Sequence, residues 1–248
     1  TYCMPAEGIA LTPKSNLMTA DEIVTIAQTF VHLGVTKIRL TGGEPLVRKD
    51  AATIIQRLGK LGVELTLTTN GILVHDFIDT FKEAGIKALN VSIDSLQKEK
   101  YTTITRRNYF EKLWENLDLL YENNFQVKLN VVVIKGFNDN EIIDFIELTK
   151  DRSIQIRFIE FMPFDGNQWN KEKLVSYAEI LSQVSSFYTD EVVERISDKP
   201  NDTAKNHKIQ SYKGSFSVIS SVTNTFCRSC KWIRLSADGK LKNCLFWN

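Results

Sequence analysis

The feature that most constrains the fold is an alternation of short apolar, β-branched segments with amphipathic segments, which continues to Pro163. Each apolar segment predicts a strand and each amphipathic segment predicts a helix. A capping-box pair, Thr19 and Glu22, predicts the first helix start, and Gly34 its end. The predicted strands cover residues 35–41, 63–69, 88–93, 127–134 and 154–161, and further helices start at Asp50 and cover about 76–84, 109–122 and 141–150.

Strand–helix units of this length predict parallel strands joined by right-handed crossovers, and hence a barrel or an open α/β sheet. The strands are apolar enough that we expect them to be covered on both faces. After Pro163 the pattern changes to a loop, a helix at 176–183 and short strands at 192–195, 208–212, 215–220, 233–236 and 241–244. We therefore expect two domains, residues 1–165 and an antiparallel, β-rich extension at 166–248.

The overall charge excludes few classes of function, and it gives no support for binding to nucleic acid or to a membrane. The formal net charge of the 248 residues is +1, and 43% of them are hydrophobic, as in an ordinary globular protein. We expect neither nucleic acid nor a membrane as a partner, because there is no basic excess and no apolar run of the roughly 20 residues that a span needs. A basic pocket for a small anion remains compatible with this balance.

Three of the four cysteines form a C-x2-C-x13-C block, and the turn-forming segment 237–240 lies between the last two. Three thiolates leave one position open on a zinc ion or on an iron–sulfur cluster, and an open position is where a ligand binds. The alternatives are a structural zinc site completed by Cys3 and chance clustering. The cysteines of the block are Cys227, Cys230 and Cys244.

Polar residues gather where the predicted strands end, which is where parallel α/β folds bind ligands. Each has a simpler structural interpretation as a turn, a helix cap or a core residue, but their recurrence at four strand ends favours a site. They are Gly42, Gly43, Glu44, Thr68, Thr69, Asn70, Ser92, Asp94, Glu160 and Met162.

Three cations, Arg39, Lys128 and Arg157, lie within strands that otherwise look buried. Buried cations need an anionic partner. They predict either a clamp for a polyanion such as a nucleoside triphosphate, or internal ion pairs with Glu44 or Glu160.

On these residues the chain resembles the GTP 3′,8-cyclase family of radical S-adenosylmethionine enzymes, which catalyse the first step of molybdenum-cofactor biosynthesis. The opening Cys3 segment is similar to the end of that superfamily's C-x3-C-x2-C motif. The matching segments are Thr1–Pro5, Arg39–Pro45, Leu67–Gly71, Asn90–Asp94, Arg157–Met162, Phe226–Cys230, Asp238–Lys240 and Cys244–Phe246.

The resemblance implies a partial, TIM-like radical SAM barrel, two 4Fe–4S clusters and S-adenosylmethionine as cofactors. Cys3 would ligate the first cluster, and Cys227, Cys230 and Cys244 the second, whose fourth iron takes the guanine. S-adenosylmethionine would contact Tyr2, Gly43, Ser92 and Met162. GTP would contact Arg39, Thr68, Lys128, Arg157, Trp232 and Arg234.

The implied reaction converts GTP to 3′,8-cyclo-7,8-dihydro-GTP. A 5′-deoxyadenosyl radical removes the 3′ hydrogen, and the carbon radical attacks C8; no general acid or base is assigned. The resemblance also implies a reducing donor such as flavodoxin or ferredoxin, a downstream pyranopterin-forming enzyme and a cytoplasmic location. The oligomeric state stays open, with a homodimer among the alternatives.

Three departures from the family pattern bear on function. The first two cysteines of the N-terminal motif and the strand before them are not in this sequence, and the sequence stops shortly after Cys244. We expect a truncated cyclase that is inactive as these residues alone. Trp232 stands where the family commonly has arginine, so one substrate contact is lost or replaced by stacking. The alternatives are a radical SAM enzyme acting on a peptide, and a non-catalytic zinc module.

Overall fold

The computed structural model describes residues 13–163, 167, 169–198, 202–224 and 230–244. They form two compact units, which are considered one at a time. The N-terminal unit comprises residues 13–92, 111–127 and 232–244 of the described chain, and the central unit comprises the rest. A domain boundary near residue 165 stays a prediction.

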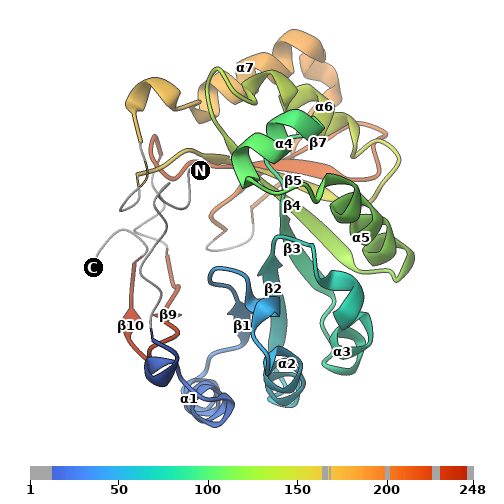
Figure 1. The fold of residues 1–248 in the computed structure, drawn as a ribbon. Coiled ribbons are helices and arrows are strands. Elements are labelled where there is room, and N and C mark those ends of the chain that lie inside the picture. Colours follow the sequence, from blue (N-terminus) through green and yellow to red (C-terminus); the bar gives the residue numbers. More distant parts are fainter. Residues whose placement is uncertain (1–12, 164–166, 168, 199–201, 225–229, 245–248) are drawn as a thin grey trace. The chain divides into compact units, whose positions relative to one another are not determined.

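The N-terminal unit contains three parallel strands, β1 (Lys37–Leu40), β2 (Glu64–Thr69) and β3 (Ala88–Ser92). Helices α1 (Ala20–His32), α2 (Ala51–Gly59) and α3 (Ile78–Glu83) precede these strands, and Figure 1 shows them as successive neighbours. The capping box predicted at the start of α1 is confirmed, because Thr19 and Glu22 cap each other reciprocally. The α/β alternation in this unit is as the sequence predicts. Helix α5 (Phe110–Glu122) also belongs here from Glu111 onward.

The sheet of the N-terminal unit has an apolar face and a polar face, and Thr66 and Asn90 on the polar face are also only 3% exposed. Leu65, Leu67, Leu89 and Val91 are all at most 3% exposed and alternate with polar residues along β2 and β3. Because side chains alternate along a strand, the apolar residues point to one face of the sheet. The polar residues between them point to the opposite face.

The central unit carries a second set of parallel strands, β4 (Gln126–Val133), β5 (Gln155–Glu160) and β8 (Ser215–Ile219). Strands β7 (Lys205–Ile209) and β6 (Val193–Arg195) continue from β8 in antiparallel order. The antiparallel character of the C-terminal region is thus confirmed for β6 and β7. The parallel pairing of β8 with β5 was not predicted, because the short strand's sequence does not say which neighbour it joins.

Helices α4 (Lys98–Thr105), α6 (Ile142–Glu147) and α7 (Tyr177–Phe187) belong to the described part of the central unit. Helices α6 and α7 are neighbours (Figure 1). Helix α4 was not predicted, because only two of its residues, Tyr101 and Ile104, are buried and its apolar periodicity is weak.

A short hairpin completes the described part of the N-terminal unit. Strands β9 (Arg234–Leu235) and β10 (Leu241–Lys242) pair antiparallel around the predicted turn. Gly239 has a φ of +83° and donates its N–H to the carbonyl of Ser236 at 3.0 Å. The backbone N–H of Met18 donates to the carbonyl of Ala237 at 2.9 Å and thereby ties the hairpin to the segment before α1.

Among the described helices, none is both long enough and apolar enough to cross a membrane.

Candidate functional site

The polar face of the N-terminal unit brings together three residues that the sequence predicts at the site. Arg39 is in register with Thr66, and Thr68 is in register with Asn90, so Arg39, Thr68 and Ser92 share this face. Asn90 Nδ2 donates to Thr68 Oγ1 at 3.2 Å, which orients the hydroxyl across the two strands. All three predicted residues are half-buried. A cation and two hydroxyl groups therefore lie along one sheet face.

Arg39 is the cation of this face, and its guanidinium lies over an aromatic ring. Its Cζ is 4.5 Å from the centroid of the Trp232 ring. The Arg39 Nε is buried and has no hydrogen-bond partner among the described residues. Burial lowers the pKa of Arg39; the charge of Arg234 acts in the same direction and that of Glu64 opposes it. The group stays charged at neutral pH and lacks a hydrogen-bonding anion in the described structure.

Glu44 does not pair with Arg39, which makes that alternative wrong. Its carboxylate accepts hydrogen bonds from Leu46 N at 3.1 Å, from Thr69 Oγ1 at 2.8 Å and from Asn70 N at 2.6 Å. These contacts tie the turn after β1 to the end of β2. Glu44 therefore has a structural function, because it holds the Gly-Gly-Glu-Pro turn against the end of β2.

The two glycines before Glu44 differ in what they require. Gly42 has a φ of +137°, a conformation that only glycine adopts readily. Gly43 has no positive φ, and a Cβ added there would meet no described atom within 4 Å. The backbone conformation at position 42 therefore requires glycine. Gly43 instead leaves the exposed turn open to the close approach of a ligand.

The central unit has its own polar face, which carries the other two predicted cations. Lys128 is in register with Gln155, and Arg157 is in register with Asn130. Arg157 Nε donates to Gln155 Oε1 at 3.4 Å. The Oδ1 atom of Asn130 is buried and accepts no hydrogen bond from the described residues. Lys128 and Arg157 are both half-buried, so this face is cationic and rich in amide groups.

Glu160 follows Arg157 by three positions and therefore lies on the opposite face of β5, where it is fully buried. Its carboxylate accepts the N–H groups of Tyr177 at 3.0 Å, Val222 at 2.8 Å and Thr223 at 2.9 Å, together with the Thr223 hydroxyl. The proposed Arg157–Glu160 ion pair is wrong for this reason. Glu160 instead holds the start of α7 and the segment that leads to Cys227.

Met162 lies just beyond the end of β5 and is half-buried. Its carbonyl accepts a hydrogen bond from Asn167 Nδ2 at 2.9 Å, and the neighbouring Phe161 carbonyl accepts one from Trp169 Nε1 at 2.9 Å. These contacts fix the backbone at Met162. Its predicted contact with S-adenosylmethionine stays a prediction.

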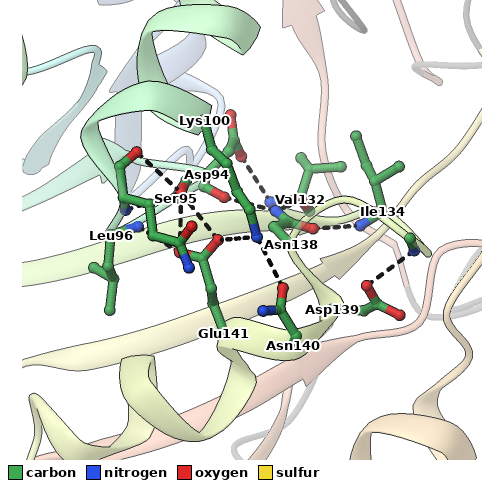
Figure 2. A network of polar contacts seen from close by, with 12 residues as sticks. Asp94, Ser95, Leu96, Lys100, Val132, Ile134, Asn138, Asp139, Asn140 and Glu141 are labelled. Carbon is green, nitrogen blue, oxygen red and sulfur yellow. Dashed lines mark hydrogen bonds and ion pairs between the residues drawn. The ribbon is translucent and has the colours of Figure 1, made fainter.

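Figure 2 shows a buried polar network around the segment that directly follows Ser92, and the sequence analysis missed it. Glu141 has no exposed surface and accepts hydrogen bonds from Ser95 Oγ at 2.9 Å and Leu96 N at 2.7 Å. Lys100 Nζ forms an ion pair with the same carboxylate at 3.0 Å. The network thus fixes the turn between β3 and α4.

A second residue of this network, Asn138, connects the same turn to β4. Its Nδ2 donates to the carbonyls of Asp94 at 2.6 Å and Val132 at 2.9 Å, while its Oδ1 accepts from Ile134 N at 2.7 Å. The Asp94 carboxylate accepts from Val132 N at 2.9 Å (Figure 2). The polar run at 138–141 directly after an apolar strand is the sequence signal that would have indicated this network.

The cysteines are only partly within the described residues. Cys230 is exposed and Cys244 is half-buried, whereas Tyr2, Cys3 and Cys227 lie outside the described residues. Within the described ranges no three His, Cys, Asp or Glu side chains form a group suited to a metal ion. Both predicted clusters therefore stay predictions.

Comparison with known families divides the chain into two matches. Residues 1–149 match the family model described as Radical SAM superfamily, and residues 154–248 match the model described as Molybdenum Cofactor Synthesis C. Among solved structures, Streptococcus suis SuiB superposes with a TM-score of 0.66 and covers 92% of this chain and 54% of its own. At 13% identity this likeness shows the fold alone.

Curated relatives match over the whole chain. The chain is 44% identical to molybdenum cofactor biosynthesis protein moc-5 of Caenorhabditis elegans over 100% of its length, but it spans only 41% of that protein. It is 48% identical to the mitochondrial GTP 3′,8-cyclase of Arabidopsis thaliana, covering 99% of this chain and 63% of the relative. It is 40% identical to the GTP 3′,8-cyclase of Listeria welshimeri, covering 100% and 75%. The chain belongs to the GTP 3′,8-cyclase family of radical SAM enzymes.

Proposed function

We propose that the protein is a GTP 3′,8-cyclase that converts GTP to 3′,8-cyclo-7,8-dihydro-GTP in the first step of molybdenum-cofactor biosynthesis. The observation that carries this proposal is the 40–48% identity to two proteins named as this enzyme, which extends over the whole chain. The cationic polar face of the central unit, with Lys128 and Arg157, supports it, because phosphate groups are recognised by cations.

The described residues fit S-adenosylmethionine at the carboxyl ends of the strands. The open turn at Gly43 admits a ligand close to the backbone, and Ser92 offers a hydroxyl on the polar face. We assign cofactor contacts to Gly43, Ser92 and Met162, and to Tyr2 on sequence grounds. Bound S-adenosylmethionine and its cluster supply a 5′-deoxyadenosyl radical in this family. Cys3 is assigned to that cluster.

The role of the chain itself is to bind and orient GTP. We assign triphosphate contacts to Arg39, Lys128 and Arg157, because phosphate is recognised by cations of fixed geometry. Asn90 Nδ2 donates to the Thr68 hydroxyl, and we assign that hydroxyl to a ribose or phosphate oxygen. Trp232 and Arg234 lie between Cys230 and Cys244 of the cysteine block, so we assign them to GTP near the second cluster. Correct orientation of the reacting carbons is the protein's main contribution to rate.

The second cluster is assigned to Cys227, Cys230 and Cys244. Held by these three thiolates, a 4Fe–4S cluster would keep one position that the protein does not fill and could accept a ligand from the substrate there. We also propose a reducing donor such as flavodoxin or ferredoxin and a downstream pyranopterin-forming enzyme. A reducing compartment suits these thiolates, which favours the cytoplasm; the name of the Arabidopsis relative makes the mitochondrion the alternative.

The test is product analysis after anaerobic reconstitution of the complete protein with iron and sulfide. With dithionite, S-adenosylmethionine and GTP, we expect equal amounts of 5′-deoxyadenosine and 3′,8-cyclo-7,8-dihydro-GTP. Deuterium at the 3′ position of GTP should appear in the 5′-deoxyadenosine. Cleavage of S-adenosylmethionine without cyclised GTP would favour a radical SAM enzyme with another substrate, such as a peptide.

Metal analysis separates this proposal from the non-catalytic alternative. A 4Fe–4S cluster at the cysteine block contains iron and acid-labile sulfide, and its EPR spectrum should change when GTP is added. One zinc ion without sulfide would indicate a structural tetrahedral site and contradict the proposal.

A further inference from the structure

Trp232 and Arg39 form a stacked pair in the N-terminal unit. The guanidinium carbon lies 4.5 Å from the centroid of the indole ring, well inside the distance at which a cation is attracted to the face of an aromatic ring. Arg39 comes from β1, and Trp232 comes from the segment just before β9. The contact therefore joins the parallel sheet to the hairpin.

The hairpin is held by further contacts within the same unit, so Trp232 is carried on a fixed element. Met18 N donates to the Ala237 carbonyl at 2.9 Å, and Arg48 Nη2 donates to the Met18 carbonyl at 2.6 Å. Arg48 is in turn held by an ion pair with Asp50 at 2.5 Å. A ring on such an element restricts the plane of the guanidinium that it covers.

The stacked guanidinium is short of hydrogen bonds. Its Nε is buried without a partner among the described residues, and Trp232 covers one face of the group. Arg234 adds a second positive charge that acts on Arg39. A desolvated guanidinium with unused N–H donors is stabilised by an anion whose oxygens accept hydrogen bonds in the guanidinium plane. Phosphate has that geometry.

We infer that Trp232 is a positioning residue for Arg39, which sets the guanidinium plane for one phosphate group of the nucleoside triphosphate. The inference rests on the proposed function and deepens it. Because the indole ring carries no charge, its effect on phosphate affinity acts through the orientation of Arg39 and not through an added charge. The effect of substituting Trp232 on ligand affinity should consequently depend on whether Arg39 is present.

The experiment is a double-mutant cycle on equilibrium ligand binding, measured by calorimetry on the anaerobically reconstituted complete protein. The ligands are GTP and, separately, inorganic tripolyphosphate. The variants are Trp232→Leu, Trp232→Phe, Trp232→Arg, Arg39→Ala and the double variant W232L/R39A. Iron content and melting temperature are measured for each, and Leu241→Ala is the control for the same hairpin because Leu241 is 59% exposed.

We expect Trp232→Leu to weaken GTP binding about tenfold, which corresponds to about 1.4 kcal/mol. Trp232→Phe keeps an aromatic face and should weaken it about twofold. In the Arg39→Ala background, Trp232→Leu should change affinity less than about twofold, because the group that the ring orients is gone. Trp232→Arg should bind GTP with a steeper dependence on salt, since it adds a charge. Leu241→Ala should leave the affinity unchanged.

The outcomes separate this inference from the proposed function. GTP binding with additive effects of the two substitutions would overturn the pair and leave the cyclase proposal standing. If tripolyphosphate binds as tightly as GTP and the effects of the two substitutions are coupled, the result would support the pair as an anion-binding element. It would count against the cyclase proposal. Failure of both ligands to bind would overturn both. A loss of affinity in Trp232→Phe as large as in Trp232→Leu would also overturn the role of the aromatic face.

Discussion

Glu141 and Lys100 form an ion pair at 3.0 Å in which the carboxylate is fully buried and the Lys100 side chain is 24% exposed. The carboxylate also accepts from Ser95 Oγ and Leu96 N, so it satisfies donors from a turn distant in sequence (Figure 2). The pair therefore belongs to the tertiary structure around the segment after Ser92.

Glu141→Ala should destabilise the protein strongly. The substitution leaves the Leu96 N–H without its acceptor and removes the charged acceptor of Ser95 and Lys100, which keep, among the described residues, only the Gln97 carbonyl at 3.3 Å and Asn140 Oδ1 at 2.9 Å. Breaking a buried ion pair costs about 3–5 kcal/mol, and we expect about 3 kcal/mol because Lys100 retains some solvent. Denaturant unfolding measures the loss. Glu99→Ala, on the first turn of α4 and exposed, should change the free energy of unfolding by less than about 0.5 kcal/mol. Equal effects of the two substitutions would contradict the network.

Glu160→Gln should loosen the segment that leads to the cysteine block. An amide group has one acceptor oxygen, so in either rotamer its NH₂ group faces backbone N–H groups that the carboxylate now binds, either those of Val222 and Thr223 or that of Tyr177. Each unsatisfied buried group costs about 1–3 kcal/mol. We expect lower thermal stability and less iron retained per chain after reconstitution. Glu194→Gln, on the exposed side of β6, is the matched control. Full iron retention with an unchanged melting temperature would contradict this role for Glu160.

Gly42→Ala and Gly43→Ala should fail in different ways. Alanine at Gly42 is forced to a φ of +137°, which costs about 1–3 kcal/mol of stability. Alanine at Gly43 meets no described atom, so stability should change by less than about 0.5 kcal/mol. Its methyl group would nevertheless obstruct a ligand that approaches the turn, and we expect S-adenosylmethionine affinity to fall about tenfold. Calorimetric binding and thermal unfolding test the pair. Unchanged affinity in a well-folded Gly43→Ala protein would contradict the assignment.

His207 should make stability depend on pH in mildly acidic solution. Burial lowers the pKa of His207 to about 4, and the charge of Arg195 acts in the same direction. The ring stacks on Phe216 at a centroid distance of 5.2 Å. The unfolded chain therefore binds a proton between about pH 6.5 and pH 4 that the folded chain does not bind. Stability is fully present above this window and falls as the pH is lowered through it.

The expected loss across that window is about 2 kcal/mol, at about 1.4 kcal/mol per pKa unit and with allowance for residual solvent around the ring. Urea unfolding at several pH values measures it. His207→Phe retains the stacking and removes the titration, so its stability should vary less between pH 6.5 and 4.5. Carboxylates with lowered pKa values, such as Glu179, contribute only below about pH 4.5 and do not confuse the comparison. An identical pH profile for His207→Phe would contradict the prediction.

Much of the fold could be predicted because its signals are local. The α1 capping box and the turn at Gly239 each depend on residues a few positions apart. The ends of β3 at Ser92 and of β5 at Glu160 were located within one residue by the change from apolar residues to polar or irregular ones. Helix α4 was not predicted, because it is stabilised by the contacts of its buried residues and its own apolar periodicity is weak.

Much less of the site's bonding could be predicted. The sequence indicated that the buried cations need anionic partners and offered Glu44 and Glu160 as candidates. These two carboxylates instead accept from backbone N–H groups and hydroxyl groups of other segments. Strand alternation alone separates Arg157 from Glu160, yet which N–H groups surround Glu160 depends on the register of β5 with β8. Glu141 and Asn138 were missed for the same reason.

The sequence by itself determined the α/β alternation, the polar strand ends and the cysteine spacing, because helix caps, turns and side-chain periodicity act over a few residues. Only the tertiary structure decided that Arg39 stacks on Trp232, that Glu141 accepts from the turn after β3, and that β8 runs parallel to β5. Such choices depend on strand register and on burial, since a desolvated charge binds whichever donor, acceptor or ring the fold brings within reach.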